Sequence, residues 1–151
     1  MRKTEYHPGA DGFHDLYLGH GIYIHWLRNA LCKTIQLDLI LSQPLCKPEN
    51  ALGALISRLG ERGTVNLPTM QEVGCAVDQL YGAFLSTNVS VLGNRHLLNV
   101  SLEVLAPHYV EKRDRSDLLP KALDIVRQIA MDPLTEGGQF REQYVEQERQ
   151  V

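Results

Sequence analysis

Long hydrophobic runs, paired cysteines and an excess of basic residues are all missing from this 151-residue sequence. The longest apolar stretches, residues 37–41 and 97–105, are interrupted by polar or charged side chains, so neither could span a bilayer. The N-terminus begins with charged residues but has no apolar segment of the length that a secretory signal requires. We therefore expect a cytoplasmic protein with no membrane segment.

The cysteines Cys32, Cys46 and Cys75 are odd in number and show no CxxC spacing. This pattern supports neither a disulfide framework nor a zinc ribbon. Because all three lie in or beside predicted core segments, we expect buried, inert free thiols rather than catalytic ones.

The charge of the sequence argues against nucleic-acid binding. The 15 Lys and Arg residues are outnumbered by 18 Asp and Glu residues, and the net charge is -3. The basic residues are scattered singly or in short clusters, whereas a nucleic-acid surface needs a broad basic face. We expect no nucleic-acid partner.

What is present is typical of a soluble globular domain, with 44% hydrophobic and 22% charged residues. Alternating apolar residues predict a hairpin over 15–27 that turns at Gly19-His20-Gly21, a strand over 34–41, and a hairpin over 85–104 that turns at Gly93-Asn94. Apolar residues at helical spacing predict helices over 51–59, 69–81 and 116–130, and the strongly polar residues 139–149 are interpreted as a charged, solvent-facing helix. Thr69 and Glu72 match a capping box at the start of the second helix.

Hairpins rather than crossover connections join the strands, so the predicted fold class is α+β, an antiparallel sheet with helices packed on one face. The third helix, capped by Ser116 and Asp117, should face the sheet with one stripe. That stripe consists of Leu119, Ala122, Leu123, Val126, Ile129 and Ala130. Residues 1–14 are interpreted as a polar leader and 15–151 as the folded part. The last helix stops at Val151 without a capping residue, so we expect the natural chain to continue.

Several short strings occur in the order and at the intervals found in one peptidase family. They are Gly-His-Gly-Ile-Tyr-Ile-His in the first hairpin, Arg62-Gly63-Thr64, Met70-Gln-Glu with Leu80-Tyr81-Gly82-Ala83, and Phe140 with Glu146-Gln-Glu-Arg-Gln-Val. Together they resemble the start of M16 (pitrilysin/insulinase-like) metallopeptidases from about Gly19 to Val151. The resemblance implies the N-terminal portion of one half-domain of the LuxS/MPP-like metallohydrolase fold.

The chemistry of that family depends on an inverted zinc motif, HxxEH, just ahead of a Gly-Thr pair. Histidines four apart on a helix can hold one zinc ion, and the glutamate between them takes a proton from the metal-bound water. Counting back from Gly63-Thr64, the equivalent positions are Ala54, Ser57 and Arg58. Alanine offers no lone pair, serine is no general base near neutral pH, and arginine carries a permanent cation. Of the family's ligands, the resemblance retains only Glu146, so zinc, which the family implies, is not expected here.

Two alternatives concern individual residues. The six histidines show no pair at i, i+4, so a relocated metal site is disfavoured. Arg58 could bind a substrate carboxylate in the former zinc cavity, although pairing with Glu61 or Glu146 on the helix surface is the favoured interpretation.

The resemblance therefore implies a non-catalytic M16-like protein that helps to form a peptide-binding chamber. Its partners would be a peptide or protein, together with a second half, a zinc-bearing homologue or another copy of itself. The alternative is an active zinc-dependent peptidase that uses a non-standard site or residues beyond Val151. A third hypothesis, a small stand-alone interaction module, requires this chain to be the whole natural protein.

Overall fold

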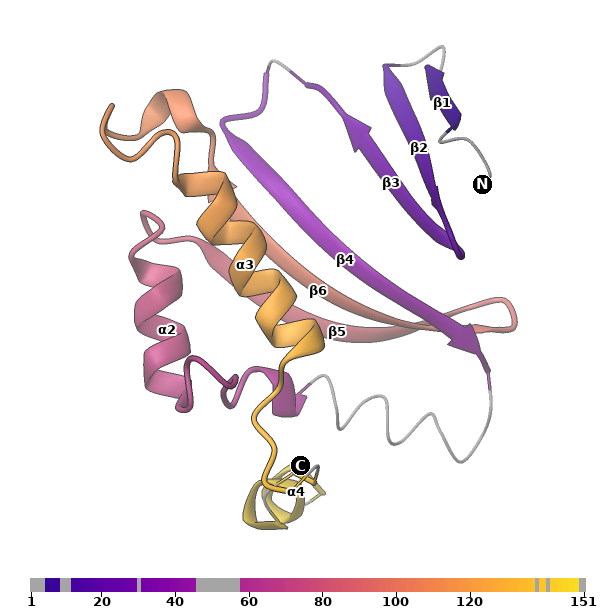
Figure 1. Ribbon diagram of the computed structural model, residues 1–151, viewed down its shortest axis with the longest axis vertical. Coiled ribbons are helices and arrows are strands. Elements are labelled where there is room, and N and C mark those ends of the chain that lie inside the picture. The colour runs from indigo at the N-terminus through magenta and orange to yellow at the C-terminus, as the bar shows by residue number, and fades with distance from the viewer. Residues whose placement is uncertain are drawn as a thin grey trace. The chain divides into compact units, whose positions relative to one another are not determined.

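The computed structural model describes residues 5–8, 12–29, 31–45, 58–137, 139–140 and 142–149 (Figure 1). The chain divides into two compact units, residues 1–33 and 34–151. All strand pairing in both units is antiparallel. The first unit is a sheet alone, and the second contains a sheet together with the helices.

The first unit is a three-stranded sheet in the order β1 (Glu5–Pro8), β2 (Phe13–Gly19) and β3 (Ile22–Leu27). The predicted hairpin is confirmed, and its turn contains His20 and Gly21, with positive φ angles of 54° and 79°. Residues 5–8 and the start of β2 were interpreted as polar leader, but the structure places them in strands. Glu5–Pro8 has no run of alternating apolar residues to mark it as a strand, and it forms one because it pairs with the adjacent β2.

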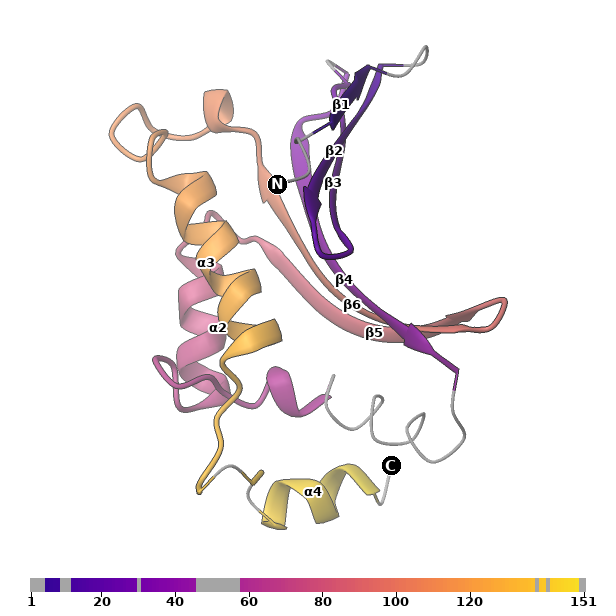
Figure 2. The ribbon, with the colours of Figure 1, turned by 45° about the vertical axis from the view of Figure 1, so that its right-hand side comes forward.

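The second unit contains β4 (Thr34–Pro44), β5 (Phe84–Leu92) and β6 (Arg95–Leu105), and β6 is the central strand (Figure 2). The second predicted hairpin is confirmed, with Gly93 at φ 59° in its turn. Alternate residues of β6 are buried on one face, among them Val100, Leu102 and Val104. β4 extends beyond the predicted 34–41 because it pairs with β6 along its whole length.

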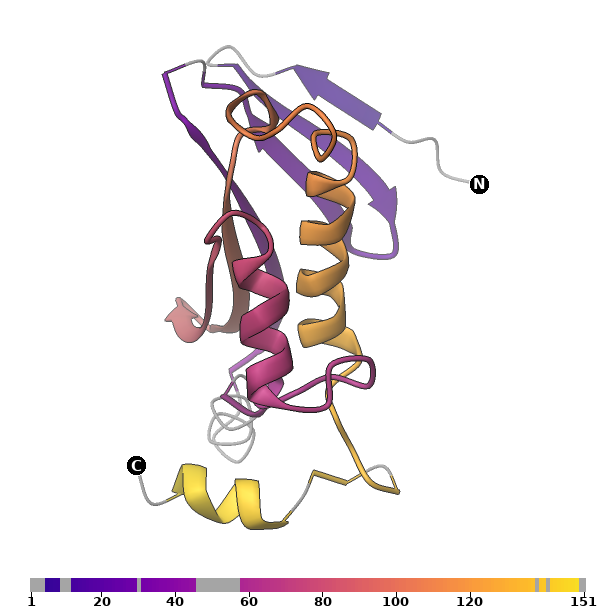
Figure 3. The same ribbon diagram turned by 90° about the vertical axis from the view of Figure 1, so that its left-hand side faces the viewer.

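Two helices, α2 (Met70–Asp78) and α3 (Leu118–Met131), lie side by side on this buried face and run in opposite directions (Figures 2 and 3). A 3-10 turn, η1 (Pro107–Tyr109), follows β6. The last helix, α4 (Glu142–Arg149), confirms the predicted polar C-terminal helix. No helix within the described ranges is both long and apolar enough to cross a membrane.

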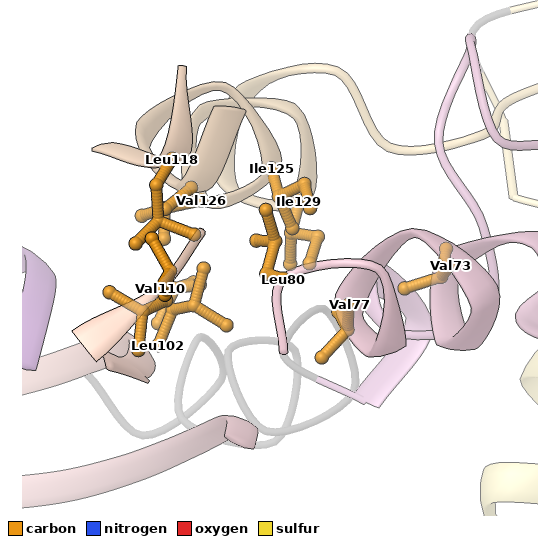
Figure 4. Packing of buried hydrophobic residues seen from close by; sticks show 12 residues of the cluster. Val73, Val77, Leu80, Leu102, Val110, Leu118, Ile125, Val126 and Ile129 are labelled. Atoms are coloured by element: carbon orange, nitrogen blue, oxygen red, sulfur yellow. The ribbon is translucent and has the colours of Figure 1, made fainter. Parts of the chain in front are cut away.

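The core lies between the two helices and the β4-β6-β5 sheet (Figure 4). The α3 face that meets the sheet is confirmed by the burial of Ala122, Val126 and Ile129. Two details differ from the predicted stripe: Leu123 is 55% exposed, and Ile125 is buried instead. The reason is that α3 also packs against α2, which draws Ile125 into the core beside Leu80.

The fold class is α+β with antiparallel sheets, as the sequence predicts. The expected single sheet is replaced by two three-stranded sheets, and the helices α2 and α3 cover one face of the second.

Candidate functional site

Of the three positions that the resemblance aligns with the zinc motif, the structure describes one. Ala54 and Ser57 lie outside the described residues, and Arg58 is exposed and is the first described residue of the helical stretch at 58–60. The next two residues are held in place by packing. Leu59 is 3% exposed, and a Cβ on Gly60 would lie 3.1 Å from the carbonyl oxygen of Ile129 in α3. The segment is therefore packed directly on α3.

The Gly63-Thr64 pair joins the segment 58–62 to the end of α3. Thr64 is fully buried; its hydroxyl donates to Gln128 Oε1 at 2.9 Å and accepts from the Leu67 N–H at 3.0 Å. Its backbone forms an isolated bridge with Pro133. Buried polar groups that are fully hydrogen-bonded hold a loop in one conformation. Thr64 thus fixes the loop that follows the helical residues 58–60.

Glu61 reaches from this segment to the edge of the sheet. Its Oε1 accepts hydrogen bonds from both the backbone N–H and the hydroxyl of Thr87 in β5, each at 2.8 Å. Glu61 and Glu146 are the two proposed partners of Arg58. The Glu61 carboxylate is hydrogen-bonded to Thr87 of β5.

The other proposed partner, Glu146, is exposed on α4. A different side chain of α4 lies near this segment: the guanidinium carbon of Arg62 is 5.9 Å from the centroid of the Tyr144 ring. The helix α4, which carries Glu146, is therefore near Arg62.

The histidines are distributed over both units, and each has its own surroundings. His25 Nδ1 lies 2.6 Å from Asp15 Oδ1, and His14 stacks on Trp26 in the same sheet. His96 is buried on β6, where its Nδ1 lies 3.2 Å from Gln43 Nε2. Within the ranges that the structure describes, no three His, Cys, Asp or Glu side chains gather as metal ligands.

The expectation that the thiols are buried is wrong for the two described cysteines. Cys32 and Cys75 are both exposed. Cys75 lies on α2, where the buried positions are Val73 and Val77, so its side chain is on the outer face of the helix. Cys46 lies outside the described residues.

Sequence reasoning missed a groove of about 450 Å³ between α2 and α3. At its edge the Tyr81 hydroxyl donates to Asp114 Oδ2 at 2.5 Å. This hydrogen bond raises the pKa of Tyr81 and lowers the pKa of Asp114. Tyr81 has a φ of 63°, the left-handed conformation that non-glycine residues rarely adopt. The position of Tyr81 before Gly82 at a helix end was the only sequence signal, and nothing local indicated Asp114.

No protein-family model matches the chain. A relative from Bacillus subtilis (strain 168), named "Probable inactive metalloprotease YmfF", is 30% identical over 131 residues, which cover 87% of this chain and 30% of the relative. This chain is homologous to a protein named as a probable inactive metalloprotease. A crystal structure of a conserved protein from Enterococcus faecalis V583 matches with a TM-score of 0.84 and 26% identity, over 92% of this chain and 32% of that one. The chain thus spans about a third of the length of each.

The side chains present do not fit the zinc ion that the resemblance implies. Arg58 places an exposed cation at the third motif position, and cations repel a metal dication. One carboxylate, Glu146, cannot replace the three protein ligands that a catalytic zinc site uses.

Proposed function

We propose that this chain is the N-terminal portion of a non-catalytic M16-type protein, of LuxS/MPP-like fold, that binds extended peptide segments without hydrolysing them. Two findings support the proposal: the relative named as a probable inactive metalloprotease, and the cation of Arg58 at a motif position. The proposed location is the cytoplasm.

The observation that carries the binding role is the edge of β5. Within the described part of the chain, β5 has one strand neighbour, β6, so its opposite side is an edge. An extended peptide can add to such an edge through backbone hydrogen bonds, with alternate side chains giving specificity. The edge lies beside the loop 58–64 because Glu61 contacts Thr87, so a peptide bound there would pass the former catalytic position.

A chamber for that peptide would need more protein than this chain supplies. The chain spans 30% of the relative and 32% of the solved structure that it matches. We propose that the remaining walls come from a second half, from a zinc-bearing homologue or from another copy. In a complex with a zinc-bearing homologue, this chain would bind substrate and the homologue would cut it.

The proposal predicts binding without cleavage. The probe is a fluorescein-labelled peptide of alternating threonine and valine, as long as β5 (9 residues). Fluorescence anisotropy should detect binding to the chain, and mass spectrometry should recover the peptide intact. The control peptide carries proline at alternate positions, because proline has no N–H to donate to a strand edge.

Two outcomes would contradict the proposal. Equal binding of both peptides would exclude pairing with a strand edge. Cleavage together with a stoichiometric zinc ion that survives dialysis would favour the alternative, an active metallopeptidase, and Glu146→Ala should then abolish zinc binding.

A further inference from the structure

Glu61 occupies the edge of β5 at the point where a bound peptide would make its hydrogen bonds. The Thr87 N–H donates to Glu61 and therefore points away from β6. In an antiparallel pair, alternate residues point their backbone groups to the same side. Leu85, Thr87, Val89 and Val91 thus form the outer edge. The Glu61 oxygen, 2.8 Å from the Thr87 nitrogen, takes the place of the carbonyl oxygen of an added strand.

The contact divides the edge in two. Thr87 is the fourth residue of β5 (Phe84–Leu92), so three residues remain on one side and five on the other. Adjacent outward-pointing positions are about 6.7 Å apart along a strand, so a peptide could not avoid the Glu61 side chain and still pair along the whole edge. Full pairing requires the carboxylate to leave Thr87.

The position of Glu61 is built into the fold. On one side, Leu59 and Gly60 are buried, and the Arg62 N–H donates to the Leu59 carbonyl oxygen at 3.1 Å. On the other side, the loop is held by the buried Thr64. The carboxylate makes two short, charge-assisted hydrogen bonds to Thr87, which are stronger than neutral ones.

We propose that Glu61 is an autoinhibitory gate on the edge of β5, which holds the peptide site closed until its carboxylate is displaced. This inference rests on the proposed function, because it concerns access to the same edge. The apparent affinity for a peptide is then reduced by the fraction of molecules in which the gate is open.

The test compares Glu61→Ala with wild type, using the alternating threonine-valine peptide and the whole 151-residue chain. Removing the carboxylate should raise the affinity roughly tenfold, the change expected when a charge-assisted hydrogen bond no longer competes. Glu61→Gln keeps an acceptor oxygen without the charge and should give a smaller gain. Glu111→Ala, which removes the same charge from an exposed loop, is the control and should give none.

Amide hydrogen exchange identifies the surface that binds. In Glu61→Ala the Thr87 amide should exchange faster without peptide, and added peptide should protect Leu85, Thr87, Val89 and Val91. Unchanged protection of β6 amides would show that the variant is folded.

Three outcomes would contradict the proposal that Glu61 closes the edge of β5. If Glu61→Ala and wild type bind the peptide equally at this edge, the proposed function stands and the gate is wrong. If Glu61→Ala self-associates without gaining peptide affinity, Glu61 protects the edge from pairing with other copies. If neither protein shows peptide-dependent protection of β5, peptide binding at this edge is wrong and the gate is wrong with it.

Discussion

At the scale of single residues, polar groups position the loops on either side of the α2–α3 layer. Near the start of α2, Gln128 accepts from Thr64 and donates to Asp124 at 2.7 Å, so a buried amide joins the loop 63–68 to α3. Near the end of α2, Tyr81 and Asp114 join two segments 33 residues apart. Hydrogen bonds between distant segments restrict the backbone, and both of these border the groove.

The Tyr81–Asp114 contact predicts a pH dependence of stability. The pKa of Asp114 is lowered in the folded state, so its contribution is present above the unfolded pKa and is lost as the pH falls through the folded pKa. The pKa of Tyr81 is raised, so its contribution is present below the unfolded value of 10.0 and is lost as the pH rises through the folded value.

Replacing Tyr81 with phenylalanine removes both contributions. In urea unfolding, the difference in stability between wild type and Tyr81→Phe should be largest between about pH 5 and pH 9, and should narrow toward both extremes. Tyr109→Phe, at a half-exposed tyrosine whose ring lies tilted against that of His108, is the control. A difference that stays constant with pH would mean that the hydrogen bond does not distinguish the folded from the unfolded state.

At the scale of elements, two glycines predict opposite effects of the same substitution. A Cβ on Gly63 would lie 2.8 Å from the Pro68 carbonyl oxygen, a backbone atom, so Gly63→Ala must displace the loop and should destabilise the protein. Gly74 lies inside α2 with nothing within 4 Å of its Cβ position. Gly74→Ala should stabilise the protein by about 0.5–1 kcal/mol, because alanine loses less conformational freedom in a helix.

Urea unfolding of the two variants provides an internal comparison, since the chemical change is identical. A Gly63→Ala protein as stable as wild type would show that the loop 63–68 can shift freely. That outcome would also weaken the inferred anchoring of Glu61.

Elements with local signals were predictable from the sequence. The capping box at the start of α2 is formed by Thr69 and Glu72 as predicted, and both glycine turns are where expected. The predicted cap of α3 does not form. The Asp117 carboxylate accepts a hydrogen bond from the Ser116 hydroxyl instead of from a helix N–H. Short polar side chains have several local partners, and the sequence does not choose between them.

The candidate site was less predictable than the elements. The positions Ala54, Ser57 and Arg58 were assigned by counting back from the Gly63-Thr64 pair, and this assignment stays a prediction. The contact of Glu61 with Thr87 joins residues 26 apart, and it exists only because the segment 58–62 meets the edge of β5. Such a pair leaves no periodic signal in the sequence.

At the scale of the whole molecule, the two units differ in how many hydrophobic side chains they bury. All the buried hydrophobic residues identified belong to residues 34–151, whereas every residue of β3 is exposed. The stability of a three-stranded sheet depends on a hydrophobic face that is covered. The second sheet has this cover from α2 and α3.

This difference predicts two levels of protection against amide hydrogen exchange. The central strand β6 carries Val100, Leu102 and Val104 in the core, so its amides should exchange only through global unfolding. The amides of β2 and β3 should exchange faster, through local opening that leaves the second unit folded. If both sheets instead exchange at the same slow rate, the first sheet is stabilised by a contact that buries it, and the two units unfold together. A faster rate for β2 and β3 would show that the first unit opens while the second unit stays folded.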